Sequence, residues 1–307
     1  MDDRASLAVV IVSWNVSELL DQCLASLQVA LENNPLRSSV WVLDNDSSDD
    51  TPEQVRTNHP WVNLIQSVDN LGFVRGNNRV IQHLLQVKAP PTYIWLLNPD
   101  TIVRKHAVER LIVFMQSHPR AGLIGPKLLN TDGTLQTCAF RFPGVIQPLF
   151  DLHLMPERLY HTRLNGRYPR EWFDQTTPFQ IDHPLGAAMF ARTQMIREVG
   201  LLDPGFYMYC EEVDWAWRMR DAGWEVWLVP EAEVIHIGGA STNQVRPLTT
   251  RYLWQSRALL YAKHHGFFAR WLVAHIVKRV FSARLAKADT RAWRETYEAI
   301  IRAWEVA

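Results

Sequence analysis

The chain has 307 residues, of which 47% are hydrophobic, so it suits one large or two ordinary globular domains and is neither disordered nor fibrous. Its 32 Lys and Arg residues balance its 32 Asp and Glu residues, and without an overall positive field we expect no nucleic-acid partner. The balance is uneven along the chain. Residues 246–307 hold 12 basic and 4 acidic side chains, which gives this tail a charge of about +8 and the body about −8.

The three cysteines, Cys23, Cys138 and Cys210, are odd in number and far apart, which fits neither a disulfide framework nor a zinc-finger spacing. We expect them to be small buried side chains in a reducing compartment. The apolar run at residues 7–12 is too short for a signal sequence or a membrane span. The sequence therefore predicts a cytoplasmic protein.

Residues 7–97 alternate short apolar runs with segments of helical periodicity. Runs rich in Val and Ile predict strands at 7–12, 40–43, 62–66 and 93–97. Helices are expected at 17–27, from Thr51-Pro52 onward, and at 77–87. Four strands that alternate with three helices predict an α/β fold, a doubly wound and mostly parallel sheet with helices on both faces.

The rest of the chain departs from this alternation. Residues 141–183 are rich in proline and aromatic side chains without a sustained period, which predicts an irregular insertion that shapes the site of a second substrate. Beyond it the sequence predicts a strand at 186–190, helices at 194–199 and 211–222, edge strands at 224–229 and 233–236, and basic, aromatic helices at 251–264 and 268–286.

Polar clusters follow three of the predicted strands, at Ser13-Trp14-Asn15, at Asp44-Asn45 and at Asn98-Pro99-Asp100. Because ligands of such sheets bind outside the carboxyl ends of the strands, we expect these clusters to face one crevice. Asp44 and Asn45 suit a nucleotide base or ribose, although ordinary turn chemistry would also explain them.

The Asn98-Pro99-Asp100 segment holds two oxygen-bearing side chains on a backbone that proline restrains. Hard cations such as Mg²⁺ or Mn²⁺ prefer such oxygen ligands, whereas a simple type I turn is the alternative. His236 ends a predicted strand and precedes small residues at 238–241, where an imidazole would complete a metal or phosphate site if it is not structural.

The segment from Asn70 to Asn78 predicts a polar loop that contains Gly72 and Gly76, and Asn77-Asn78 lies where a helix N-terminus would offer N–H groups to an anion. It matches neither a Walker loop nor the Gly-x-Gly-x-x-Gly spacing, which disfavours a P-loop or dinucleotide site.

Three carboxylates fall in the first turn of the helix predicted at 211–222. Asp214 has the spacing of an ordinary ion pair with Arg218, and acidic residues stabilise a helix N-terminus. Adjacent Glu211 and Glu212 follow aromatic residues, where burial and mutual repulsion would raise one pKa and create a general base.

Taken in order, these motifs resemble those of the family 2 glycosyltransferases, and among them the bacterial rhamnosyltransferases that build cell-surface polysaccharide. The matching stretches are residues 9–15, 43–49, 70–73, 97–100, 186–187, 211–214 and His236. The resemblance covers residues 7–245. It implies a GT-A domain at 1–245 with an acceptor-side insertion at 141–183, a helical tail at 246–307, and inverting displacement at an anomeric carbon.

The resemblance also implies roles for individual residues. Nucleotide-binding positions are Ser13, Trp14, Asn15, Asp44, Asn45, Asn70, Gly72, Phe73, Asn78 and Asn98, the last standing where the family has the first acid of its Asp-x-Asp element. Asp100 and His236 would hold Mg²⁺ or Mn²⁺. Glu212, in place of the usual Asp, would be the catalytic base, with Asp214 as a second catalytic residue. Glu211, Gly186 and Trp215 would contact the acceptor.

The partners implied are a nucleotide-sugar donor, with dTDP-rhamnose favoured and UDP-sugars open, and a glycan or lipid-linked acceptor. The basic, aromatic tail suits an anionic membrane surface, which would place the protein on the inner face of the cytoplasmic membrane. The alternative is that the tail packs on the acidic body or forms a homodimer interface.

Two other functions stay open at this point. Asn98 and the Glu-Glu pair would fit a non-catalytic nucleotide-sugar or glycan-binding protein on the same fold. A nucleotidyltransferase is disfavoured because Ser13-Trp14-Asn15 offers no basic, glycine-rich loop.

Overall fold

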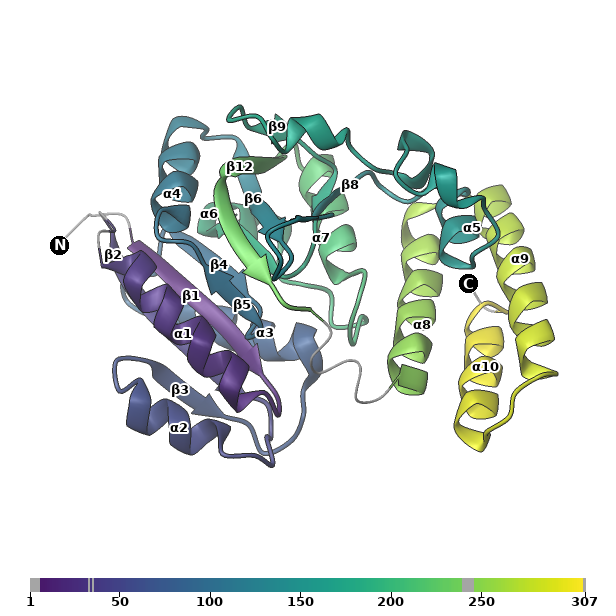
Figure 1. Cartoon of the computed structure of the whole chain (residues 1–307), viewed down its shortest axis with the longest axis horizontal. Helices are drawn as coiled ribbons and strands as arrows, with labels where there is room; N and C mark the ends of the chain where they lie inside the picture. The colour runs from purple at the N-terminus through teal and green to yellow at the C-terminus, as the bar shows by residue number, and fades with distance from the viewer. Residues whose placement is uncertain (1–5, 33, 35, 239–245, 306–307) are drawn as a thin grey trace.

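The computed structural model describes residues 6–32, 34, 36–238 and 246–305, and its core is one mixed sheet of ten strands (Figure 1). Parallel pairing joins β1 to β2 and β4, β2 to β3, and β6 to β12, whereas β11 and β5 run antiparallel to their neighbours. The strands along the sheet are, in order, β3 (Asn63–Gln66), β2 (Arg37–Asp44), β1 (Ser6–Ser13), β4 (Tyr93–Leu97), β11 (Ala188–Arg192), β6 (Ala121–Leu129), β12 (Glu225–His236) and β5 (Thr101–Val103).

The first half of the chain confirms the predicted alternation of strands and helices. Strand β1 is buried along most of its length, which explains why its sequence is a continuous apolar run instead of an alternating one. Strand order reverses at β1, because β2 and β3 lie on one side of it and β4 on the other. A crevice for a ligand is expected at such a switch point, outside the carboxyl ends of β1 and β4.

Helices cover both faces of the sheet. One face is covered by α1 (Ser17–Leu31), which contacts both α2 (Thr51–Asn58) and α4 (Ala107–Ser117). On the other face, α3 (Gly72–Gln86) packs on β1 and β2 (Figure 1). Helix α4 and strand β6 were not predicted from the sequence. The three cysteines are buried and unpaired as expected, and burial raises the pKa of Cys23 and of Cys138 to about 12.

Two predicted elements need correction. Helix α3 begins at Gly72 and not at residue 77, so the predicted polar loop is in fact the first turns of a helix. The predicted edge strands at 224–229 and 233–236 are one strand, β12, that lies inside the sheet between β6 and β5. A shift of register between Val229 and Glu233 accommodates Pro230 within the pairing with β6.

The insertion at 141–183 is irregular, as predicted. Its elements are short: α5 (Gln147–Asp151), three single-turn 3₁₀ helices (Glu157–Leu159, Arg163–Asn165 and Arg170–Trp172) and β9 (Phe179–Gln180), which pairs with β12. Strand β7 (Leu135–Gln136) pairs with β6, and β8 (Ala139–Phe140) pairs with β10 (His183–Pro184). The next helices are α6 (Thr193–Val199) and α7 (Glu211–Asp221).

The tail forms three helices, α8 (Arg246–His264), α9 (Phe267–Leu285) and α10 (Arg291–Ala303), of which the last was not predicted. They share a second apolar core, in which Trp254, Phe281 and Trp304 meet Leu152 from the insertion. No helix of the described residues has the length and apolarity needed to cross a bilayer. The predicted boundary at 245/246 falls at the edge of residues 239–245, which lie outside the described residues, as do 1–5 and 306–307.

Candidate active site

The carboxyl end of β2 presents a buried carboxylate to the crevice. Asp44 is 2% exposed; its Oδ2 accepts from the backbone N–H of Ser47 at 3.4 Å, and its Oδ1 is buried without a partner in the described residues. An unpaired buried carboxylate oxygen is costly unless a ligand N–H or O–H donates to it. This position therefore suits a group such as a base N–H.

The side chains of Asn45 and Asn70 are joined by a hydrogen bond. Asn45 Nδ2 donates to Asn70 Oδ1 at 2.9 Å, and Asn45 Oδ1 accepts from the backbone of Leu71 at 2.8 Å. Asn70 Oδ1 also accepts from the backbone of Gly72 at 2.9 Å. These bonds tie the end of β2 to the start of α3, so both amides shape the crevice wall.

Gly72 cannot carry a side chain here. Its φ of +73° is left-handed, and an added Cβ would lie 2.7 Å from Cε2 of Tyr207. Phe73 beside it packs on the main core. Asn78, one turn further on, donates to the carbonyl of Leu202 at 2.7 Å, while its Oδ1 is buried without a partner in the described residues.

Hydrogen bonds join the loop after β1 to the loop after β2. Asn15 adopts a φ of +53°; its backbone N–H donates to Ser47 Oγ at 3.0 Å, and its Oδ1 accepts from the backbone of Ser48 at 2.7 Å. Ser13 is fully buried, and its hydroxyl has no partner in the described residues. Trp14 lies between them and is half-buried. The loops after β1 and β2 thus form one rigid wall.

Asp100 and His236 meet although 136 positions separate them. Register between β5 and β12 places Thr101 opposite His236, and the Nε2 atom of His236 lies 3.4 Å from Oδ1 of Asp100. The other ring nitrogen, Nδ1, lies 2.7 Å from Oε1 of Gln136, whose Nε2 donates to the carbonyl of His236 at 3.1 Å. Gln136 was not foreseen, because only the β6–β7 hairpin brings it to this histidine.

This pair has the chemistry of a divalent-cation site. Two donor atoms about 3 Å apart can share an ion that lies about 2.1 Å from each. A proton on Nδ1, held by Gln136, leaves the lone pair of Nε2 free for a metal. No cluster of three or more His, Cys, Asp or Glu side chains occurs among the described residues, so waters and phosphate oxygens would have to complete the coordination.

Helix α7 begins with the two adjacent glutamates, Glu211 and Glu212. Tyr209 and Cys210 both adopt left-handed backbone, with φ of +69° and +65°, which costs free energy for residues other than glycine and is common at functional sites. Burial, reinforced by the charge of Glu212, raises the pKa of Glu211 well above its ordinary value. Burial also raises the pKa of Glu212 to about 7, although Arg257 opposes part of this rise.

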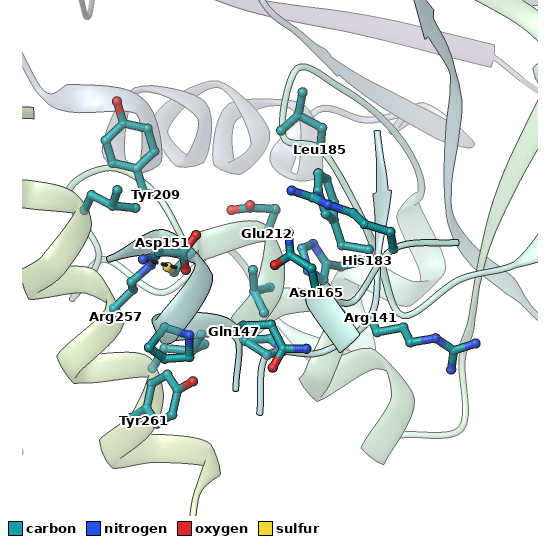
Figure 2. Close-up of a pocket in the computed structure, with 18 residues that line it drawn as sticks. Arg141, Gln147, Asp151, Asn165, His183, Leu185, Tyr209, Glu212, Arg257 and Tyr261 are labelled. Carbon is teal, nitrogen blue, oxygen red and sulfur yellow. Dashed lines mark ion pairs between the residues drawn. The ribbon is translucent and has the colours of Figure 1, made fainter. Parts of the chain in front are cut away.

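Glu212 faces a cavity of about 250 Å³, and its carboxylate points into the space between Asp151 and Asn165 (Figure 2). Three separate parts of the chain form the walls. The body contributes Leu185, Tyr209 and Val213; the region from β8 through the insertion contributes Phe140, Arg141, Gln147, Pro148, Asp151, Asn165, Arg167 and His183; and α8 contributes Leu253, Arg257, Leu260 and Tyr261.

The cavity residues from the insertion and from α8 were not predicted individually. An ion pair of 2.8 Å joins Arg257 to Asp151 (Figure 2). Arg167 lies over the ring of Phe140 at 4.6 Å, and burial lowers its pKa. The sequence indicated these cavity residues only indirectly, through the proline-rich insertion and the basic tail that contain them.

Two residues that the resemblance placed in the site lie elsewhere. Asp214 is fully buried and bound by Arg218 at 2.8 Å, Lys263 at 2.6 Å and His264 at 2.8 Å, so its carboxylate is not available to a substrate. Trp215 is also fully buried in the main core and donates to the carbonyl of Gly200 at 2.9 Å, which excludes direct acceptor contact. The helical period turns Asp214 by about 200° from Glu212 and so away from the cavity that Glu212 faces.

The turn at Gly186-Ala187 connects Glu212 with the Asp100 region. A Cβ on Gly186 would lie 3.9 Å from Cγ of Glu212. The next residue, Ala187, accepts at its carbonyl from the backbone N–H of Asn98 at 2.9 Å. Asp100 itself does not line the cavity that Glu212 faces. The turn thus contacts Glu212 directly and pairs with the backbone two residues before Asp100.

Comparison with known proteins agrees with this architecture. A family model described as "Glycosyltransferase like family 2" matches residues 4–297. The chain is 30% identical over 252 residues to the N-acetylglucosaminyl-diphospho-decaprenol L-rhamnosyltransferase of Mycobacterium tuberculosis (strain ATCC 25618 / H37Rv), and the match covers 78% of each protein.

Two solved structures share the fold at 14% identity. One is GalNAc-T7 with UDP, GalNAc and Mn²⁺, with a TM-score of 0.60 over 100% of this chain, which spans 57% of that chain. The other is the mannosyltransferase PcManGT of Pyrobaculum calidifontis in complex with GDP-Man and Mn²⁺, with a TM-score of 0.58 over 99% of this chain and 87% of that one.

The chain has a fold of the GT-A type, which confirms the fold expected from the sequence. The chain belongs to glycosyltransferase family 2.

Proposed function

We propose that this glycosyltransferase moves a hexose, with L-rhamnose from dTDP-rhamnose as the favoured case, from a nucleotide diphosphate to a hydroxyl of a glycan or lipid-linked glycan, with inversion. The observation that carries the proposal is the position of Glu212. It combines a pKa of about 7 with a place on the wall of a cavity of about 250 Å³, beside the Gly186-Ala187 turn. The rhamnosyl and lipid-linked parts rest on the mycobacterial relative.

The donor would lie in the crevice outside β1, β2 and β4. The unpaired Oδ1 of Asp44 would accept from the base, and half-buried Asn98 would contact the ribose or a water. Asn45, Asn70 and Gly72 hold the wall against which the nucleoside would rest.

The diphosphate would bind near Asp100 and His236, the residues that would hold Mg²⁺ or Mn²⁺. When bound, such a cation neutralises charge on the departing nucleoside diphosphate. The two solved neighbours described with Mn²⁺ are consistent with this proposal. The contribution of the protein is to fix the tautomer of His236 through Gln136.

Glu212 would remove the proton from the acceptor hydroxyl as the oxygen attacks the anomeric carbon from the face opposite the diphosphate. A base with a pKa of about 7 is ionised in a large fraction of molecules at neutral pH and still holds a proton strongly enough to be effective. A single displacement of this kind inverts the configuration at the anomeric carbon.

The acceptor would enter the cavity between the insertion and α8. Arg167 is half-buried and forms no ion pair with a carboxylate of the described residues. The charge of Asp151 acts on Arg167 without direct contact. The acceptor named for the mycobacterial relative carries a diphosphate, and such a group would give Arg167 an ion-pair partner.

The test is Glu212→Gln, which keeps the size of the side chain but cannot accept the proton. We expect transfer to fall by at least roughly 10³-fold, while binding of the nucleotide sugar, followed by thermal shift, stays within about twofold. Glu171→Gln, an exposed change in the insertion, is the matched control.

Near-normal turnover by Glu212→Gln would remove this residue from the role of base. A wild-type protein that binds nucleotide sugars but never releases nucleoside diphosphate with any acceptor would instead favour the non-catalytic binding function. A panel of dTDP- and UDP-sugars in the same thermal-shift assay identifies the donor.

A further inference from the structure

Helix α9 is apolar on two opposite faces. One face is buried in the second core through Val273, Val277 and Phe281. The other carries four large apolar side chains that are exposed to solvent. We call these the α9 patch: Phe267 (72% exposed), Phe268 (82%), Trp271 (58%) and Leu272 (41%). A helix that packs on one side only would carry polar residues at these positions.

The four side chains of the α9 patch point the same way. At about 100° per residue, positions 267, 268, 271 and 272 fall within an arc of about 140°. His275 and Arg279 continue this arc along the helix, and both are exposed. The face therefore begins with an aromatic end and continues into a cationic stretch. Single exposed apolar residues are ordinary in proteins, but a contiguous group of this kind marks an interaction surface.

The charge around the α9 patch has one sign. Helices α8 and α9 contain four Lys or Arg residues each and neither contains Asp or Glu. Two of the four acidic side chains of the tail, Glu295 and Glu298, lie in α10 and pair with Arg291 and Arg302 of the same helix. An apolar, aromatic face with basic residues beside it is complementary to the headgroup region of an anionic bilayer.

The α9 patch also lies close to the cavity that contains Glu212. It begins six residues after Tyr261, which lines that cavity and donates to the carbonyl of Gly144 at 2.5 Å. His265, in the short turn between the helices, stacks on Tyr261 with ring centroids 4.4 Å apart. Figure 1 shows the end of α8, the start of α9 and the cavity helix α5 at the same end of the molecule.

We propose that the α9 patch inserts into the interfacial region of an anionic lipid bilayer and so holds the cavity of Glu212 close to the membrane surface. Trp271 and the two phenylalanines supply the buried apolar area, and exposed Arg279 in the same arc faces the lipid phosphates. This surface would let an acceptor that is anchored in lipid reach the base without leaving the bilayer. The inference extends the proposed function, but lipid binding itself does not require transfer.

The experiment is vesicle flotation with the full chain, without donor or acceptor. One set of vesicles is phosphatidylcholine alone, and the other contains about one third phosphatidylglycerol. We expect the wild-type chain to float with the anionic vesicles and to remain largely unbound with the neutral ones. The variant F267S/F268S/W271S should lose at least roughly tenfold of its partitioning, and Arg279→Gln roughly fivefold.

The matched control is V68S/V113S, which removes two exposed apolar side chains, 92% and 55% exposed, that lie outside the tail. It should float like the wild type. Thermal unfolding of each variant checks that folding is unchanged, as expected for exposed positions. Because flotation is scored without turnover, loss of binding here is independent of whether Glu212 is the base.

Three results would overturn the proposal. The triple variant could float as well as the wild type, or the wild type could stay in solution with anionic vesicles. Sedimentation without lipid could also show a wild-type dimer that the triple variant dissociates, in a protein that binds no vesicles, which would make the α9 patch a contact between two copies of the chain.

Discussion

Arg257 of α8 forms a 2.8 Å ion pair with Asp151 of α5 on the wall of the cavity that Glu212 faces (Figure 2). The guanidinium group of Arg257 also lies over the ring of Trp254, 4.7 Å from its centre. Its positive charge lowers the pKa of Glu212 against the larger effect of burial. A residue of the tail thus tunes the candidate base of the body.

Replacing Arg257 with Gln should therefore make Glu212 harder to ionise. Since the proposed base must be deprotonated, the acidic limb of kcat/KM against pH should move to higher pH, and activity at pH 6 should fall more than activity at pH 8.5. Arg302→Gln, an exposed change in α10, is the control. An unshifted limb in Arg257→Gln would show that this cation does not act on the titrating group.

Removal of divalent metal should stop transfer. We expect EDTA to abolish activity and Mg²⁺ or Mn²⁺ to restore it, with Asp100→Asn needing far more metal for the same rate. Gln136→Leu should weaken the response to metal by about tenfold or more, because the tautomer of His236 is no longer fixed. Gln194→Leu, at an exposed site on α6, should not change it. Full activity in chelator would refute the metal assignment.

Asp214 should prove structural. Burial alone would raise its pKa, but His264, Lys263 and Arg218 together lower that pKa well below its ordinary value. Asp214→Asn leaves these cations without their buried partner, so the free energy of unfolding at pH 7 should fall by about 3 kcal/mol in urea titrations. Asp221→Asn, exposed on the same helix, should change little.

The pH dependence of this effect has a definite sign. A carboxylate whose folded pKa is lowered stabilises the protein above its unfolded value of 3.8, and this contribution is lost as the pH falls toward the folded pKa. The difference between wild type and Asp214→Asn should therefore shrink at acid pH. A constant difference would mean that packing, and not charge, is what the substitution disturbs.

Glu211 should have the opposite effect on stability. Its pKa is raised in the folded protein, so the ionised form is disfavoured by folding and stability is lost as the pH rises above the ordinary value of 4.5. Glu211→Gln should raise the melting temperature at pH 8 and change it much less at pH 4.5. The exposed Glu157→Gln should have no such pH-dependent effect. Equal gains at both values would contradict the burial of a charge.

The sequence by itself located the motifs and the sheet that carries them. Continuous Val and Ile runs at β1 and β4 signalled strands covered on both faces, and polar residues directly after them signalled a crevice. Asp44 and His236 end strands β2 and β12, and Asp100 follows β4, while the roles of all three stay predictions. The helix that holds Glu211 and Glu212 was also predicted from its local pattern.

Only the tertiary structure decided which carboxylate of α7 faces the cavity and which is held in ion pairs. Glu212 and Asp214 are two residues apart and equally acidic in sequence, but a helix turns by about 200° over that interval, so one faces the cavity and the other is neutralised by α8. The cavity itself unites the body, the insertion and the tail, whose contacts depend on long-range packing and have no local signature. Periodicity reports which face of an element is buried, but not what buries it.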